Sequence, residues 1–121
     1  MDVSGNNGRL LVNLLSAASR RAEVISNNIA NQNTPGFKRS TVEFEDLLAR
    51  ELRSGGSGRD LLAIAPEVQV DQLSPGRGDG NNVHMELETN AMNQNRLMYE
   101  TYSAILTGRM EMIRASIEES R

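Results

Sequence analysis

The sequence of 121 residues contains no cysteine and no tryptophan, and only 3% of its residues are aromatic. The absence of cysteine excludes disulfide bonds, thiolate metal sites and cysteine nucleophiles. His84 is the only histidine; it lies in a segment of alternating polarity, where a surface position is the default, and no carboxylate partners for a metal site can be nominated. Apolar residues make up 38% of the chain, which is little for a compact core.

Charge and motif content exclude several further classes of function. The net charge is −3 and the 13 basic residues are scattered, so the sequence predicts no nucleic-acid partner. No apolar run approaches the ~18 residues of a membrane span. The Gly-rich segment 76–80 lacks the Lys-Ser/Thr ending of a phosphate loop, and no Ser-His-Asp set has a supporting context. We therefore expect no enzyme activity, no catalytic residues, no cofactor, no metal and no small-molecule substrate.

The N-terminal part of the chain carries a heptad pattern. Residues 1–8 are polar and Gly-rich, so we expect a disordered leader. From residue 9, apolar positions recur at spacings of 4, 3, 4, 3 and 4, which predicts an amphipathic helix over 9–33. These positions are Leu11, Leu15, Ala18, Ala22, Ile25 and Ile29. A helix packed within its own domain explains the pattern equally well, but the scarcity of other apolar residues favours cover by neighbouring molecules.

The same segment has some features of a secretory signal peptide. Residues 9–18 are largely apolar, but Asn13 and Ser16 interrupt them and no positively charged region precedes Arg9. We therefore expect that no signal peptide is cleaved here.

A turn follows the first helix. Pro35-Gly36 suits a type II turn, and Thr34, which precedes proline, should end the helix. In the middle region, 34–87, Ser40 and Glu43 have the spacing of a capping box for a short helix that Gly55-Gly56 would end. Residues 54–58 have the composition of a flexible linker.

Two short segments of the middle region alternate in polarity. One contains Val68 and Val70, and the other contains Val83, Met85 and Leu87. Alternation indicates strands, so a small β element formed by these two segments is expected; for the second segment, an extended lead-in to the following helix is the alternative.

A helical pattern returns over 88–121. Its seam positions follow spacings of 3, 4, 3, 4, 4, 3 and 4: Met92, Asn95, Tyr99, Tyr102, Leu106, Met110, Ile113 and Ile117. The predicted fold is mainly α: two long terminal helices packed as an antiparallel coiled-coil hairpin, with a short helix and a small irregular or β middle region. We expect both seams to be assembly surfaces.

Asn28 lies on the seam side of the first helix. A buried amide needs a hydrogen-bond partner, whereas an Asn at a helix end can also face water, and the sequence leaves both alternatives open. If the long helices pair with Leu11 near Ile113, Asn28 comes near Asn95. We therefore predict an Asn28–Asn95 amide contact that sets the register of the two helices.

One segment resembles a family signature. The residues that carry it are Ser26, Asn27, Asn28, Ile29, Ala30, Asn31, Thr34, Pro35, Gly36, Phe37 and Lys38. This pattern, which follows an amphipathic helix near the N-terminus, resembles the signature of the bacterial flagellar rod, hook and hook-associated axial proteins. The short chain, segment 78–83 leading into Glu86 and Glu88, and the ending around Tyr99 are most similar to the short proximal rod members of that family.

The resemblance implies a structural role. Such a protein would leave the cell unfolded through the flagellar type III export apparatus, without a cleaved signal peptide, and polymerise through its terminal helices. It would form part of the periplasmic rod, the drive shaft of the flagellum. The implied partners are copies of itself, other rod proteins, the adaptor that joins ring to rod, and the export gate. The alternatives are another short proximal rod protein, a soluble coiled-coil export chaperone or assembly factor, and a small cytoplasmic coiled-coil regulator.

Overall fold

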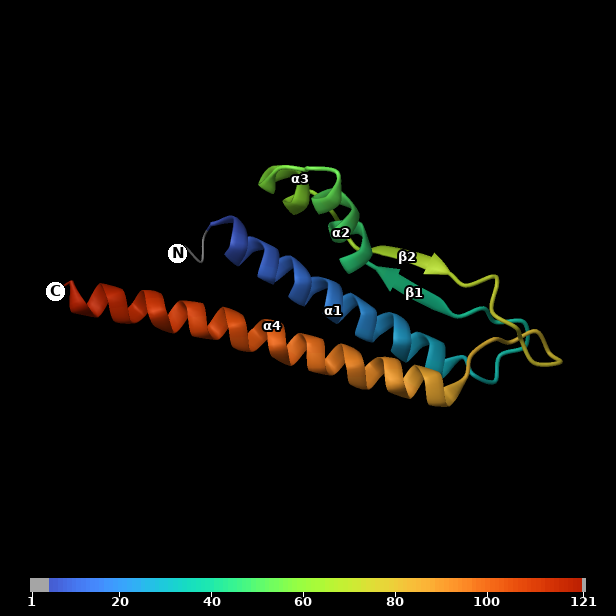
Figure 1. The fold of residues 1–121 in the computed structure, drawn as a ribbon. Helices are drawn as coiled ribbons and strands as arrows, with labels where there is room; N and C mark the ends of the chain where they lie inside the picture. Colours follow the sequence, from blue (N-terminus) through green and yellow to red (C-terminus); the bar gives the residue numbers. More distant parts are fainter. Residues whose placement is uncertain (1–4, 121) are drawn as a thin grey trace.

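A computed structural model describes residues 5–120, which form four helices and two strands. In chain order they are α1 (Asn6–Ala30), β1 (Ser40–Glu43), α2 (Glu45–Arg53), α3 (Gly58–Leu62), β2 (Glu67–Val70) and α4 (Met85–Glu119). Figure 1 shows α1 and α4 side by side in opposite directions, with the two strands, α2 and α3 on the other side of α1. The predicted fold class is confirmed: two long helices, short helices and a small β middle region.

Helix α1 is the middle layer of the molecule. The core consists of Ala17 of α1 with Phe44 and Leu48 at the start of α2, and four partly buried apolar residues pack around it: Leu10, Leu14, Leu61 and Ile64. Asn95 of α4 reaches the other side of α1, where it bonds to the carbonyl of Ala18. α1 thus buries two faces, one against α4 and one against the middle region, which lets a chain with few apolar residues form a core.

The two strands form an antiparallel ribbon in which Ser40 lies opposite Val70 and Val42 opposite Val68. The strand predicted at Val68 and Val70 is confirmed. Its predicted partner, the segment with Val83, Met85 and Leu87, is wrong, because α4 begins at Met85. Acidic residues in the first turn stabilise a helix N-terminus, and Glu86 and Glu88 occupy that turn. The chain therefore continues as a helix where alternation suggested a strand.

The predicted capping box at Ser40 and Glu43 is also wrong, since both residues lie in β1. The capping box of the structure is at the N-terminus of α3. There Ser57 Oγ accepts a hydrogen bond from the backbone N–H of Asp60 (3.3 Å), and the Ser57 N–H donates to Asp60 Oδ2 (2.9 Å). The segment predicted as a flexible linker, 54–58, therefore ends in a capped helix start.

Helix boundaries differ from the predicted ones at both ends of α1. Residues 6–8 of the predicted leader are helical and Gly8 is buried, while residues 1–4 lie outside the described part of the chain. α1 ends at Ala30, three residues before the predicted end, and hydrogen-bonded turns follow it. Gly36 has a φ of 73°, as the predicted turn at Pro35-Gly36 requires. α4 begins three residues before the predicted Glu88.

The axial register of the long helices differs from the prediction by one heptad. Asn28 contacts Glu88, seven residues before its predicted partner Asn95, and counting along both helices from this contact places Leu11 opposite about Ile105 and not Ile113. A heptad pattern looks the same after a slip of seven residues, so the seam alone could not determine this offset. Counting outward from the Asn28–Glu88 contact, the start of α1 lies opposite about Met110. The last part of α4 therefore extends past α1 (Figure 1).

None of the described helices combines the length and the hydropathy that crossing a membrane would require.

Phe44 is the largest buried apolar residue, with 1% of its surface exposed. We predict that Phe44→Ala lowers the free energy of unfolding by about 3–5 kcal/mol, because the truncation leaves a cavity between α1 and α2. The control is Leu73→Ala, at a residue that is 95% exposed, which should change stability by less than about 0.5 kcal/mol. Urea titrations followed by circular dichroism measure both values, and equal effects would contradict the assigned core.

Candidate functional site: a polar junction and an uncovered helix end

The segment after α1, the loop before α4 and the first turn of α4 meet in a network that we call the polar junction. It consists of Asn28, Arg39, Asp71, Asn81, Asn82 and Glu88, with their backbone partners. Asn28, Asn81, Asn82 and Glu88 are buried polar residues with no more than a trace of exposed surface. Buried polar groups are costly unless hydrogen-bonded, so each must be partnered.

Asn28 joins three elements. Its Nδ2 donates to the carbonyl of Ser40 (2.8 Å), and its Oδ1 accepts from the N–H of Ser40 (2.9 Å). The amide thus pairs with Ser40 as a neighbouring strand residue would. The same Nδ2 also donates to Glu88 Oε2 (3.2 Å). The buried alternative for Asn28 is therefore correct, but its partners are Ser40 and Glu88, and the predicted contact with Asn95 is wrong.

Asn95 has separate partners. Its Nδ2 donates to the carbonyl of Ala18 (2.8 Å), and its Oδ1 accepts from Arg21 (3.2 Å). Arg21 in turn forms an ion pair with Glu45 at the start of α2 (2.5 Å). This second polar link ties α4 to α1 and to the middle region about two turns further along α4 than Glu88.

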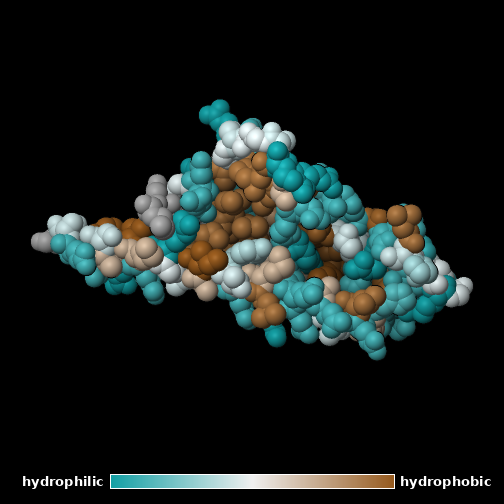
Figure 2. All heavy atoms as spheres, in the orientation of Figure 1, coloured by the Kyte–Doolittle hydropathy of each residue, from teal (hydrophilic) through white to brown (hydrophobic). Residues whose placement is uncertain are grey.

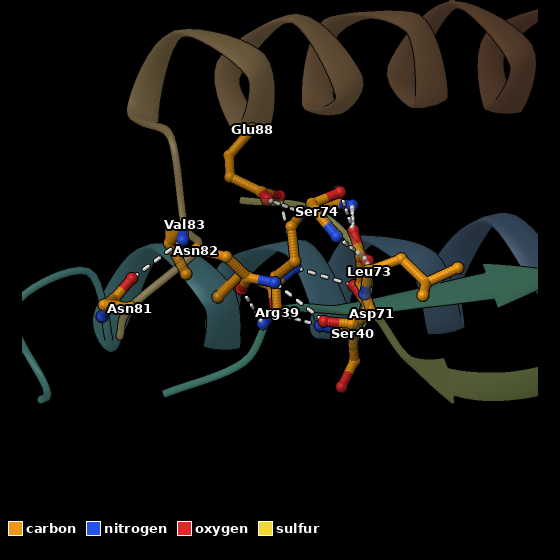
Figure 3. Close-up of polar contacts among 10 residues, drawn as sticks. Arg39, Ser40, Asp71, Leu73, Ser74, Asn81, Asn82, Val83 and Glu88 are labelled. Carbon is orange, nitrogen blue, oxygen red and sulfur yellow. Dashed lines mark hydrogen bonds and ion pairs between the residues drawn. The ribbon is translucent and has the colours of Figure 1, made fainter. Parts of the chain in front are cut away.

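The charged centre of the junction is Arg39. Its Nε donates to Glu88 Oε1 (2.6 Å) and its Nη1 to Asp71 Oδ2 (3.3 Å). Although burial opposes its charge, hydrogen bonding to Glu88 and Asp71 raises the pKa of Arg39. Of the three side chains only Glu88 is fully buried, so removing Arg39 would leave a buried charge uncompensated, which is strongly destabilising. The arrangement therefore depends on all three side chains. Figure 3 shows Glu88 pointing from α4 toward Arg39.

Two consecutive asparagines complete the junction. Asn82 Oδ1 accepts from the N–H of Arg39 (2.7 Å), and its Nδ2 donates to the carbonyl of Asp71 (2.7 Å). Asn81 Nδ2 donates to the carbonyls of Asn31 and Thr34, both at 2.8 Å. These two carbonyls also accept the backbone N–H groups of Thr34 and Phe37, so Asn81 adds a second hydrogen bond to each and ties the turn after α1 to the loop before α4. Figure 3 shows both asparagines in the segment that leads to Val83.

The turn that carries the family-like signature forms one wall of the junction. The N–H of Gly36 donates to the carbonyl of Asp79 (2.8 Å), and Lys38 Nζ donates to the carbonyl of Gly80 (2.5 Å). Other signature residues remain outside the network: Ser26, Asn27, Ala30 and Pro35 are exposed, and Ile29 is half-buried. Arg39, Asp71, Asn81 and Asn82 were not predicted as site residues; the only signal in the sequence was the polar Asn81-Asn82 pair next to the apolar Val83.

The predicted seams differ in how far the chain covers them. On α1, Leu11, Ala18 and Ile25 are buried, while Leu15, Ala22 and Ile29 are half-buried. On α4, Asn95 is buried, and Met92, Tyr102, Leu106 and Ile113 are half-buried. Tyr99, Met110 and Ile117 are exposed. The α1 seam is thus largely covered within the chain, whereas the C-terminal part of the α4 seam is open.

We call residues 110–119 of α4 the overhang. Met110 and Ile117 there are 56% and 54% exposed, and Met112, on another face, is also exposed. Figure 2 shows hydrophobic atoms on the part of α4 that extends past α1. Contiguous exposed apolar residues mark interaction sites. The overhang is therefore a surface that a partner can cover.

Within residues 5–120 no group of three or more His, Asp or Glu side chains is placed to hold a metal ion. His84 is exposed and precedes α4 as its N-cap residue. The junction satisfies its own hydrogen bonds, so its role is to hold elements together.

Comparison with known proteins agrees with the motif. The family model described as "Flagella basal body rod protein" matches residues 10–38, which cover most of α1 and the turn wall of the junction. The flagellar basal body rod protein FlgB of Aeromonas hydrophila is 38% identical over 100 residues, covering 72% of this chain and 74% of that protein. FlgB of Borrelia hermsii is 34% identical over 108 residues, covering 75% of this chain and 80% of that protein. The chain belongs to the flagellar basal body rod protein family.

A further relative matches a shorter stretch of this rod protein. The rod protein FlgG of Caulobacter vibrioides is 54% identical, but over only 43 residues that make up 36% of this chain and 16% of that protein. The FlgB relatives match over 70–87% of this chain. Among rod proteins, this chain is therefore most like FlgB.

Asn28→Asp tests the junction. The substitution removes the Nδ2 donor and places a carboxylate beside Glu88, so we predict a loss of about 3 kcal/mol of unfolding free energy at pH 7. The control is Asn33→Asp, at an exposed residue, which should stay within about 0.5 kcal/mol of the original chain. Urea unfolding measures both, and a tolerated Asn28→Asp would show that the Ser40–Asn28–Glu88 contacts are not stabilising.

Asp71 makes stability depend on pH. Hydrogen bonds from the hydroxyl and N–H of Ser74 lower the pKa of Asp71 from 3.8 to about 2. A carboxyl group whose pKa is lower in the folded state contributes stability above its unfolded pKa and loses it as the pH falls through the folded value. We predict that the stability gap between the original chain and Asp71→Asn narrows from pH 5 to pH 3 in urea titrations. The control is Glu100→Gln, at an exposed site on α4. The difference in unfolding free energy between this variant and the original chain should stay the same from pH 5 to pH 3.

Proposed function

We propose that the chain is a structural subunit of the proximal rod of the flagellar basal body and polymerises through its two terminal helices into the drive shaft needed for motility. The observation that carries the proposal is the overhang, where seam residues lie outside the fold of the single chain. Covering apolar surface drives most protein association, so neighbouring subunits would stabilise this part of α4.

The polar junction suits such a subunit. A shaft transmits torque only if its subunits resist sliding of one long helix along the other. The Asn28–Glu88 and Asn95–Ala18 hydrogen bonds fix α1 and α4 at two points along their length. Each is buried, so a slip would leave polar groups unpaired. The overhang then has a fixed direction relative to the rest of the chain.

The route to the rod is part of the proposal. The subunit would leave the cell unfolded through the flagellar type III export apparatus, without a cleaved signal peptide, and assemble in the periplasm. Its partners would be copies of itself, other rod proteins, the ring-to-rod adaptor and the export gate. Family membership supports this route, and a chain without cysteine has no disulfide that would obstruct threading.

The main alternatives are another short proximal rod protein and a soluble coiled-coil export chaperone or assembly factor. Relatives named FlgB that match most of the chain favour a FlgB-like subunit over both alternatives. A chaperone would bury its seam in a closed soluble complex and would be absent from the finished structure. Mass spectrometry of purified basal bodies separates the classes, because only a rod subunit is present in stoichiometric amount.

A substitution on the overhang tests the role of its apolar face. We predict that Ile113→Asp abolishes swimming motility and rod assembly while export of the chain continues, because a charge replaces a seam side chain at the subunit contact. Ala115→Asp introduces the same charge two residues away at an exposed position off the seam, and should preserve motility. The substitution Leu15→Asp should have the same effect as Ile113→Asp, but with added loss of packing, since Leu15 is half-buried. Loss of export together with normal rods would contradict the proposal.

A further inference from the structure

Two adjoining hollows lie along the contact between α1 and α4. One, of about 270 Å³, is lined by Ala18, Ser19, Ala22, Met92, Asn93, Asn95, Arg96 and Tyr99. The other, of about 460 Å³, is lined by Val12, Leu15, Ser16, Ser19, Arg20, Glu23 and Tyr99. Both share Ser19 and Tyr99, so they adjoin at these residues, and we call the two hollows together the groove.

The groove exists because its α1 wall is built from small side chains. Ser16, Ser19 and Ala22 follow one another at spacings of three residues, so they lie along one side of the helix. Each leaves space that a larger residue would fill, while Tyr99 stands between the two hollows as an exposed aromatic residue. The result is a row of depressions between small side chains, into which apolar side chains of another helix can insert as knobs.

The same chain presents matching knobs at another place. Met110, Ile113 and Ile117 on the overhang follow spacings of three and four residues, which places them on one face. They cannot enter the groove of their own chain, because residues 92–99 of the same helix form one wall of it. Between Tyr99 and Met110 the unbroken helix α4 advances about 16 Å. A contact between the overhang and the groove can therefore form only between two molecules.

Charge favours this pairing. The overhang carries three acidic residues, Glu111, Glu118 and Glu119, and one basic residue, Arg114. The groove is lined by two basic residues, Arg20 and Arg96, and one acidic residue, Glu23, which pairs with Arg20. Exposed ion pairs contribute little energy, so apolar contact would supply the affinity and charge would help to select the partner.

We infer that the overhang of one copy of the chain docks in the groove of a second copy. This inference rests on the proposed function and specifies which surfaces meet. The two surfaces differ, so the contact is heterologous: each subunit has one groove and one overhang, and the chain of contacts continues without closing unless a ring forms. A shaft built from repeated subunits needs such an open-ended contact, whereas a symmetric dimer would use up both surfaces.

Cross-linking in assembled basal bodies tests the contact. Because the chain has no natural cysteine, only the introduced cysteines of the chain can react. Two differently tagged copies are expressed together, one with Ser19→Cys in the groove and the other with Ser116→Cys beside Ile117. Basal bodies are purified and treated with a short bismaleimide. We expect a mixed dimer carrying both tags, and a reduction of its yield by at least about threefold when Ile117→Ala is added to the Ser116→Cys copy. Leu97→Ala, at an exposed position off the seam, should leave the yield unchanged.

The matched control replaces Ser116→Cys with Ser54→Cys, at an exposed serine that follows α2, and should give no mixed dimer. Incorporation of both tags is measured in the same preparation. If both copies are incorporated and no Ser19–Ser116 product forms, the docking inference fails while the proposed function stands. A Ser19–Ser19 product as the main species would also overturn it, because that product indicates a symmetric contact. If neither copy is incorporated, the proposed function fails and the inference fails with it.

Discussion

The hydrogen bonds that Asn28 makes with Ser40 and Glu88 determine how the parts of this molecule sit relative to one another. One side chain joins the end of α1, the first residue of β1 and the first turn of α4. All three are fixed at the same point because an amide has both a donor and an acceptor, and burial penalises any group left without a partner. The ion pair between Glu88 and Arg39 then connects this point to Asp71 beyond the second strand.

These polar contacts determine the axial register of α1 and α4, which apolar packing alone leaves undetermined. Two helices with heptad seams can pack in several axial offsets that differ by seven residues, each with a similar buried area. Only one offset places Glu88 beside Asn28 and, at the same time, Asn95 beside the carbonyl of Ala18. Apolar contacts supply most of the stabilisation of the hairpin, while buried polar contacts select the register. A single polar residue in a coiled-coil seam acts in the same way.

Features that depend on interactions over a few residues could be predicted from the sequence, whereas features that depend on tertiary contacts could not. The long helices, the turn at Pro35-Gly36 and the strand at Val68 and Val70 were predictable, because periodicity and turn chemistry act over a few residues. The predicted Asn28–Asn95 contact was wrong. Both side chains are buried amides on facing helices, but Asn28 bonds to Ser40 and Glu88, and Asn95 bonds to the carbonyl of Ala18 and to Arg21. Arg39 and Asp71 could not be found from the sequence, since nothing local distinguishes them from surface charges. The strand partner was missed for the same reason: Ser40–Glu43 matches a capping box locally, and only its antiparallel pairing with Glu67–Val70, which is distant in the sequence, makes it a strand.

The polar junction and the overhang lie at opposite ends of the helix pair. One end is therefore held rigidly within the chain, while the other leaves apolar surface uncovered. A buried charged network tolerates little displacement, because hydrogen bonds depend steeply on distance and angle. Such a network belongs where the geometry is set within one molecule, as it is at Glu88. Apolar contacts are less directional, so an overhang with Met110, Ile113 and Ile117 can meet a neighbour's surface without losing an internal bond. In the proposed rod subunit, register would thereby be fixed within the chain, and apolar surface for assembly would remain at the free end of α4.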